Sequence, residues 1–139
     1  CARVTQRTSF GNKLEKFSSI RFDVAKSRCE IEQARLLTLQ AAYQIDELGV
    51  FGAMSSVSMI KIVCPQMLLN VVDRAIQAFG GMGLTQDTPF SQFYIYGRSL
   101  RFADGPDEVH MYQLGKYTVA KYRDTKIYAD DEKGDVSFQ

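Results

Sequence analysis

Residues 17–48 read FSSIRFDVAKSRCEIEQARLLTLQAAYQIDEL, and their spacing decides the fold class. Apolar or small side chains recur alternately three and four positions apart, which places them on one stripe of an α-helix. The stripe comprises Phe17, Ile20, Val24, Ser27, Ile31, Ala34, Thr38, Ala41, Ile45 and Leu48. Gly49 and Gly52 follow, as expected for the cap and turn that end a helix. We therefore predict one long helix over residues 17–48.

A second apolar stripe, over residues 57–79, predicts the next helix. Pro65 lies inside this stripe and removes one backbone donor, so a kink or a break is expected near residue 61. The glycine-rich stretch over residues 80–83 is expected to end the helix.

Two shorter helices are predicted further on. An amphipathic stretch follows Pro89 and is expected to be interrupted by Gly97. A last helix is predicted to begin at Pro106, because proline suits the first helical position and the acidic side chains of Asp107 and Glu108 suit the positive end of the helix dipole.

The predicted fold is all-α, since no segment shows the alternation of a half-buried strand. We expect an antiparallel four-helix bundle over residues 1–123 and a flexible polar tail over residues 124–139. The chain opens with Cys1 rather than methionine, and a helix-like stretch is already under way at residues 2–4. It is therefore expected to be a piece of a longer protein.

Composition excludes several classes of function. The 139 residues include 17 Lys and Arg against 16 Asp and Glu, and this net charge of +1 argues against a nucleic-acid-binding or membrane-surface protein. No apolar run approaches the roughly 20 residues of a transmembrane helix. The three cysteines lack C-x-x-C spacing and His110 is the one histidine, so no metal site is expected.

Three motifs could carry chemistry, although each alone also fits an ordinary helix end or turn. The first motif is Arg7 followed by Phe10-Gly11. An arginine can form two hydrogen bonds to a phosphate or carboxylate, and Phe10 and Gly11 are expected to anchor and turn the chain beneath it. The glycines within residues 77–83 would let a ligand approach the backbone closely. In the sequence DGPDE of residues 104–108, a carboxylate could serve as a general base or only cap the helix.

Taken in order, the three motifs resemble the C-terminal domain of flavin-dependent acyl-CoA dehydrogenases. They are Arg7-x-x-Phe10-Gly11, Gln77-x-Phe79-Gly80-Gly81-x-Gly83, and the carboxylate-glycine pair that opens the final helix. The resemblance covers roughly residues 3–123. The string DGPDEVH over residues 104–110 is more similar to one subgroup, in which some animal members join the dehydrogenase to a kinase-like domain.

The resemblance implies an enzyme that removes an α-proton from a fatty acyl-CoA thioester while the β-hydride passes to FAD, which yields a trans-2-enoyl-CoA. It places the catalytic base at Asp104 and puts Gly105 beside the thioester. It also implies that FAD is contacted by Arg7, Phe10, Gln77, Gly80, Gly81, Pro106 and Glu108. Of these, Pro106 and Glu108 would lie against the subunit's own flavin, whereas Arg7 and the stretch 77–81 would contact the FAD of a neighbouring subunit.

Two features qualify the base. Most family members have glutamate where Asp104 stands, and one methylene less shortens the reach by about 1.5 Å. Some members take the base from a helix upstream of the matched region. A carboxylate removes such a weakly acidic proton only where bound substrate expels water, and the positive end of the following helix, by favouring the charged form, opposes this activation.

The resulting prediction is the C-terminal domain of an acyl-CoA dehydrogenase that passes electrons to electron-transferring flavoprotein in fatty-acid oxidation, with the isolated domain inactive. An acyl-CoA oxidase-like relative, which gives electrons to oxygen, and a non-catalytic helical oligomerisation module are the alternatives. We expect a homodimer or homotetramer. The expected compartment is the mitochondrion, with the peroxisome as the alternative.

Overall fold

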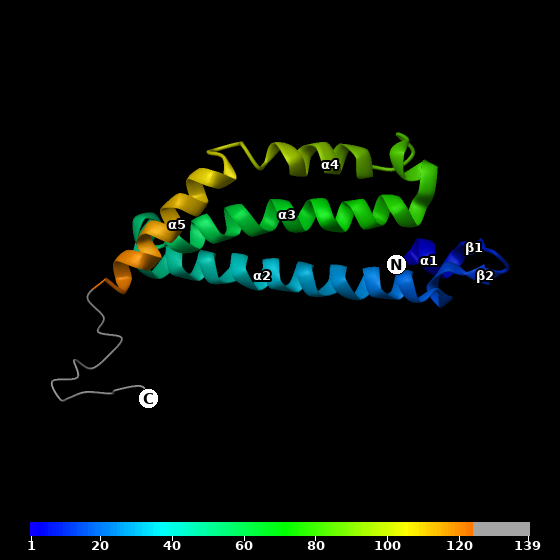
Figure 1. Cartoon of the computed structure of the whole chain (residues 1–139), viewed down its shortest axis with the longest axis horizontal. Coiled ribbons are helices and arrows are strands. Elements are labelled where there is room, and N and C mark those ends of the chain that lie inside the picture. Colours follow the sequence, from blue (N-terminus) through cyan, green and yellow to red (C-terminus); the bar gives the residue numbers. More distant parts are fainter. Residues whose placement is uncertain (124–139) are drawn as a thin grey trace, which may run out of the picture.

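The computed structural model describes residues 1–123, and the tail predicted over residues 124–139 lies outside the described part. Its long helices are α2 (Ser18–Gly52), α3 (Met54–Phe79), α4 (Phe90–Ser99) and α5 (Asp107–Lys121). α3 lies between α2 and α4, both of which run antiparallel to it, and α5 crosses the end at which α3 begins (Figure 1). The predicted all-α bundle is confirmed.

Shorter elements precede and join these helices. They are α1 (Ala2–Gln6), β1 (Thr8–Ser9), β2 (Asn12–Lys13) and the 3-10 helices η1 (Leu14–Lys16) and η2 (Gly80–Leu84). β1 and β2 form an antiparallel hairpin with Ser9 opposite Asn12, so the expectation of no strand was wrong for these four residues. Two-residue strands are too short to show an alternating pattern.

α2 packs against α3, and the small stripe residues Ala34 and Ala41 are buried, whereas Val24, Ile31 and Leu48 of the same stripe are exposed. The Thr38 hydroxyl donates to the Ala34 carbonyl at 2.8 Å, which satisfies a polar member of the stripe within the helix. Gly49 interrupts the helical backbone with φ 71° and ψ 170°, and α3 begins five residues later at Met54. The predicted turn after residue 48 is therefore confirmed.

α3 runs through Pro65 as one helix, so of the kink or break expected near residue 61, the break is absent. The proline removes one backbone hydrogen bond. However, Pro65 is buried, and α3 contacts α2, α4 and α5. Packing of three helices against α3 thus holds together a helix that proline alone would weaken.

The segment Met54–Leu84, which includes α3, is long and apolar enough to cross a membrane by length and composition, with a mean hydropathy of 1.4 in its most apolar window. The core helix of a globular protein meets the same criterion. Here α3 contacts α2, α4 and α5, and 28% of that window is buried among the described residues.

An ion pair ties α2 to the C-terminal half of α3. Arg74 Nη1 lies 2.6 Å from Glu30 Oε2, and Nη2 lies 2.8 Å from Oε1. Nη1 also donates to the Ser27 hydroxyl at 3.2 Å. The hydrogen bond from Arg74 holds the pKa of Glu30 below its ordinary value. Two parallel bonds fix direction as well as distance, so the pair sets how α2 and α3 align at this end.

The sequence predicted that Gly97 would interrupt α4, and this was wrong. Gly97 instead lies buried where α4 packs on α3. A β carbon at this position would lie 3.1 Å from Leu68 Cδ2, which is tighter than ordinary van der Waals contact. The glycine therefore allows the two helix backbones to approach closely.

Candidate functional site

The predicted site residues fall into two groups at opposite ends of the bundle (Figure 1). One group lies on α1's cap, the hairpin and the C-terminal end of α3, at the end where α1 contacts α3: Arg7, Phe10, Gln77, Gly80 and Gly81. The other occupies the α4–α5 connection and the start of α5: Asp104, Gly105, Pro106 and Glu108. Lys61, which contacts that connection, lies about 24 Å along α3 from Gln77 at the usual helical rise.

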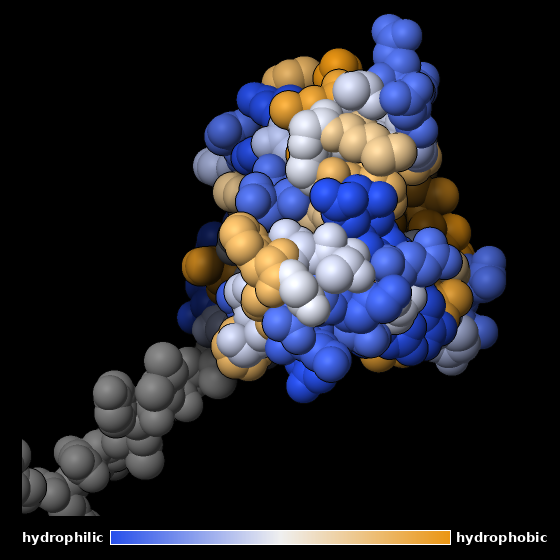
Figure 2. Space-filling model, turned by 90° about the vertical axis from the view of Figure 1, so that its right-hand side faces the viewer, coloured by the Kyte–Doolittle hydropathy of each residue, from blue (hydrophilic) through white to orange (hydrophobic). Residues whose placement is uncertain are grey.

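At the first end, aromatic contacts join α1 to α3 and α4. The guanidinium carbon of Arg3 lies 5.1 Å from the centre of the Phe79 ring, and this ring packs edge-on against Phe90 with 4.8 Å between centres. Exposed at the same end are Arg7, Gln77, Gly80 and Gly81. Figure 2 views this end, on which hydrophilic side chains are interspersed with hydrophobic ones.

Gly80 ends α3 in the left-handed region, with φ 67°. Among residues 1–123, no atom outside the immediate chain neighbours lies within 4 Å of the position that a β carbon would take on Gly80 or on Gly81. The backbone of this turn is therefore open to a ligand, as a phosphate- or adenosine-contacting turn requires.

The sequence predicted that Phe10 would anchor the hairpin. This was wrong, because the Phe10 side chain is 93% exposed. Phe10 and Gly11 form the turn with φ values of 49° and 76°. Two successive positive φ angles are typical of a type I′ turn, which favours asparagine or aspartate before glycine and strains a bulky residue. An exposed aromatic ring in a strained turn adds nothing to this chain's core and is available for a ligand or a second chain.

Phe10→Asn is expected to stabilise the chain by about 1 kcal/mol, because asparagine adopts the left-handed conformation at lower cost. The same change should reduce the FAD retained by the holoenzyme if the ring contacts FAD. Urea unfolding of the chain and the flavin content of the holoenzyme measure the two effects. Phe22→Asn, at an exposed position on α2, is the control and should not stabilise. A destabilised Phe10→Asn chain would show that the ring supports the fold.

At the second end, Asp104 lies in the loop of residues 100–106 with φ 55°, and its side chain is exposed. After glycine, aspartate and asparagine tolerate the left-handed region best, which gives a local reason for aspartate in place of glutamate. Among residues 1–123, no side-chain hydrogen bond caps the start of α5. Helix capping therefore does not engage the Asp104 carboxylate, which is available to a ligand.

Gly105 continues the left-handed path with φ 103°. A β carbon there would lie 3.3 Å from Nε2 of His110, and the same nitrogen lies 3.2 Å from the Asp104 carbonyl oxygen. Both the φ angle and the imidazole favour glycine next to the candidate base. His110 thus contacts the backbone of the loop, a role that sequence reasoning did not assign to it.

Two cationic side chains outside the predicted set also hold the loop. Lys61 Nζ donates to the Leu100 carbonyl at 2.6 Å and to the Gly105 carbonyl at 3.1 Å. Arg101 Nε donates to Asp107 Oδ2 at 2.5 Å, and the Asp107 N–H donates back to the Arg101 carbonyl at 3.2 Å. The loop is therefore fixed from the central helix and from the first residue of α5.

Sequence reasoning missed Lys61 and Arg101. Lys61 is the one charged residue in the stretch VSMIKIVC of residues 57–64, and an ammonium on an apolar helix must find hydrogen-bond acceptors. That isolated charge was a usable signal. For Arg101 no comparable signal exists, because its pairing with Asp107 depends on the path of the loop.

The start of α5 has polar atoms that fit a flavin. The helix itself begins at Asp107, one residue later than predicted, with Pro106 as the cap. The Glu108 side chain is exposed, and the backbone N–H of Glu108 has no backbone acceptor among the described residues. Within the same part of the chain, Asp107 Oδ1 and His110 Nδ1 are buried without a partner. Unpaired donors and acceptors at the positive end of a helix suit the polar edge of a flavin ring.

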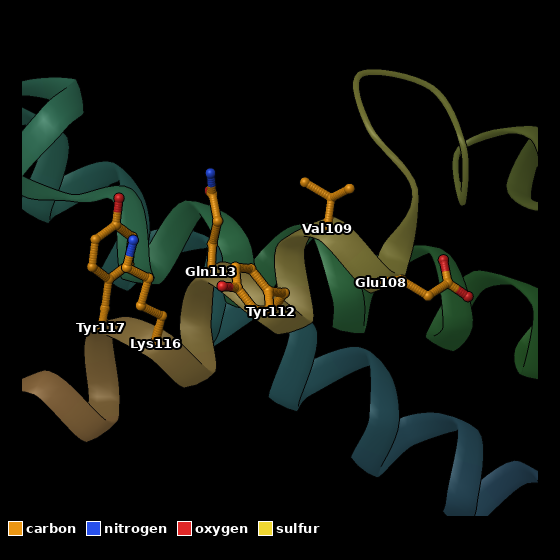
Figure 3. A pocket seen from close by; sticks show the side chains of 6 residues that line it. All are labelled: Glu108, Val109, Tyr112, Gln113, Lys116 and Tyr117. Atoms are coloured by element: carbon orange, nitrogen blue, oxygen red, sulfur yellow. The ribbon is translucent and has the colours of Figure 1, made fainter.

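An exposed face of α5 continues from Glu108 and forms a shallow pocket (Figure 3). It is lined by Glu108, Val109, Tyr112, Gln113, Lys116 and Tyr117. These positions recur at helical spacing on one side of α5, and the Tyr112 side chain is 73% exposed. Residues 1–123 contain no cluster of three His, Cys, Asp or Glu side chains that could hold a metal ion.

Comparison with known proteins gives consistent matches. Residues 1–118 match the family model "Acyl-CoA dehydrogenase, C-terminal domain". Acyl-CoA dehydrogenase family member 10 of Mus musculus is 53% identical over 114 residues, which are 82% of this chain and 11% of that protein. Family member 11 of Rattus norvegicus is 47% identical over 116 residues, which are 84% of this chain and 15% of that protein.

A solved structure, butyryl-CoA dehydrogenase from Megasphaera elsdenii, matches with a TM-score of 0.79 and 29% sequence identity. The match covers 85% of this chain and 30% of that one. The chain thus spans less than a third of the length of each of these relatives.

Proposed function

Because the chain belongs to the acyl-CoA dehydrogenase family and matches the C-terminal domain of its members, we propose that it forms part of an FAD-dependent enzyme. This enzyme converts a fatty acyl-CoA to a trans-2-enoyl-CoA. The relatives fall in the subgroup to which the DGPDEVH string is similar. The observation that carries the proposal is the Asp104 carboxylate, which is exposed on a loop fixed from both sides.

Asp104 is the base in this proposal. One of its carboxylate oxygens takes the α-proton next to the thioester, and Gly105, which has no side chain, leaves room for the thioester itself. The positive end of α5 favours the ionised carboxylate, which keeps the base ready to accept a proton but also weakens it. Exclusion of water by the bound acyl chain must therefore strengthen the base.

FAD is the cofactor of the family, and when bound it supplies the acceptor for the β-hydride. Pro106 and Glu108 would lie against the flavin of the same subunit, where the backbone N–H of Glu108, which has no backbone acceptor among residues 1–123, could donate a hydrogen bond. Arg7, Phe10, Gln77, Gly80 and Gly81 would hold the FAD of a neighbouring copy. A homodimer or homotetramer follows from this sharing.

Electron-transferring flavoprotein is the proposed electron acceptor. The proposed compartment is the mitochondrion, with the peroxisome as the alternative.

The direct test is anaerobic addition of butyryl-CoA, octanoyl-CoA, dodecanoyl-CoA and palmitoyl-CoA to the holoenzyme, with flavin absorbance as the measurement. We expect bleaching of the oxidised flavin by at least one acyl-CoA, and the dependence on chain length would define the substrate. Bleaching accompanied by stoichiometric peroxide in air would indicate an oxidase instead. A protein without bound flavin that no acyl-CoA affects would indicate a non-catalytic module.

A further inference from the structure

We infer that Lys61 is a positioning residue for the proposed base, because its ammonium holds the backbone on both sides of Asp104. Lys61 has this role only if Asp104 takes the proton, so the inference rests on the proposed function.

The geometry is that of a clamp on a short loop. Lys61 Nζ donates to the Leu100 carbonyl at 2.6 Å and to the Gly105 carbonyl at 3.1 Å. Leu100 caps the C-terminal end of α4, and Gly105 directly follows Asp104. One cation therefore fixes the separation between the end of α4 and the peptide that follows the base.

Charge and burial explain why this contact is strong. Lys61 is half-buried on an apolar stretch of α3, and a partly desolvated ammonium needs hydrogen-bond acceptors. The end of α4 supplies one, because the last carbonyls of a helix lack intrahelical partners and carry the negative end of its dipole. A hydrogen bond from a charged donor is roughly twice as strong as a neutral one.

The loop needs such support because of its backbone. Asp104 and Gly105 are consecutive residues with positive φ, 55° and 103°. For a residue with a β carbon this conformation costs free energy and persists only where the surroundings determine it. The Arg101–Asp107 and His110–Asp104 contacts each span six residues within the loop and α5. Lys61 instead ties the loop to the central helix, from 39 and 44 residues away in sequence.

Lys61→Met in the holoenzyme is the test, because methionine keeps much of the alkyl stem and removes the ammonium. A shift of the base by about 1 Å is enough to cost up to 100-fold in rate. We expect the rate constant for flavin reduction, measured by stopped flow with the acyl-CoA that bleaches the wild-type flavin fastest, to fall about 10- to 100-fold. FAD content and KM should stay within about twofold of wild type, since Lys61 donates to Leu100 and Gly105 and not to Pro106 or Glu108, and the residues that would hold the neighbour's FAD lie at the other end of the bundle.

Lys61→Arg should restore much of the rate, because a guanidinium also donates to two carbonyls. A purely structural role would instead lower stability and FAD content together, without a selective loss of kcat. Lys26→Met, at an exposed position on α2, removes the same charge and should leave the rate unchanged.

An unchanged rate in Lys61→Met would overturn the inference. If Lys61→Met does not fold, Lys61→Gln takes its place, because the shorter amide cannot reach both carbonyls. Loss of fold or FAD in both variants would also overturn it, since Lys61 would then be structural.

Asp104→Asn is measured in parallel. If Asp104→Asn loses its rate and Lys61→Met does not, only the role of Lys61 fails, whereas full activity in Asp104→Asn removes the proposed base itself.

Discussion

Asp104→Asn in the holoenzyme is expected to lower the rate of flavin reduction by acyl-CoA about 10²- to 10⁴-fold, the range that a general base contributes. Asparagine is close in size to aspartate but cannot accept the α-proton. It also tolerates the left-handed region, so the φ of 55° at this position does not strain the variant. The loss should therefore be chemical rather than structural. Stopped-flow absorbance of the flavin measures it.

The matched control for the base is Asp46→Asn, which makes the same substitution at an exposed position on α2. This variant should reduce its flavin at the wild-type rate. Asp104→Asn should also retain its FAD, because the carboxylate is not among the predicted cofactor contacts. Wild-type turnover in Asp104→Asn would mean that the base lies in another part of the enzyme.

Arg7→Ala is expected to weaken FAD binding about 10- to 100-fold, the range for loss of a hydrogen bond to a charged group. Arg7 is exposed at the cap of α1, and its guanidinium forms no ion pair within residues 1–123. Its removal should thus leave the fold intact while removing a contact to the FAD pyrophosphate. FAD content after gel filtration and titration of the apoenzyme with FAD measure the change.

Arg35→Ala is the control for Arg7. It removes the same charge from an exposed arginine of α2 whose partner is Glu32, so FAD binding should not change. Flavin content that is equal in Arg7→Ala and in the wild type would contradict the assignment of Arg7. A loss of the same size in Arg35→Ala would show that net charge, rather than a specific contact, governs FAD retention.

The helices were predictable because each has a periodic stripe or a clear terminal signal. α2 and α3 follow their stripes, and the turn at Gly49 and the end of α3 at Gly80 lie where the glycines predicted them. Local rules failed at Pro65 and Gly97, where packing against neighbouring helices decided the outcome. Sequence periodicity cannot reveal this, because it does not show which helix lies opposite.

The sequence named the candidate site residues but not the contacts that hold them in place. Asp104 and Gly105 were found through their order in the chain relative to the other motifs, whereas Lys61 reaches them from 44 residues away. Such a contact requires the packing of α3 against α4 and α5. The exposure of Phe10 was equally hidden, because an aromatic residue next to glycine predicts an anchor as readily as a free ring.

The placement of the two groups of residues at opposite ends of the bundle has a consequence for regulation by mass action. Under the proposed function, each prosthetic group depends on two polypeptides, so its occupancy is thermodynamically linked to self-association. Dilution that separates the copies would release flavin, and excess flavin would in turn drive the copies together. Expression level and flavin supply together would then set the fraction of active molecules in a cell.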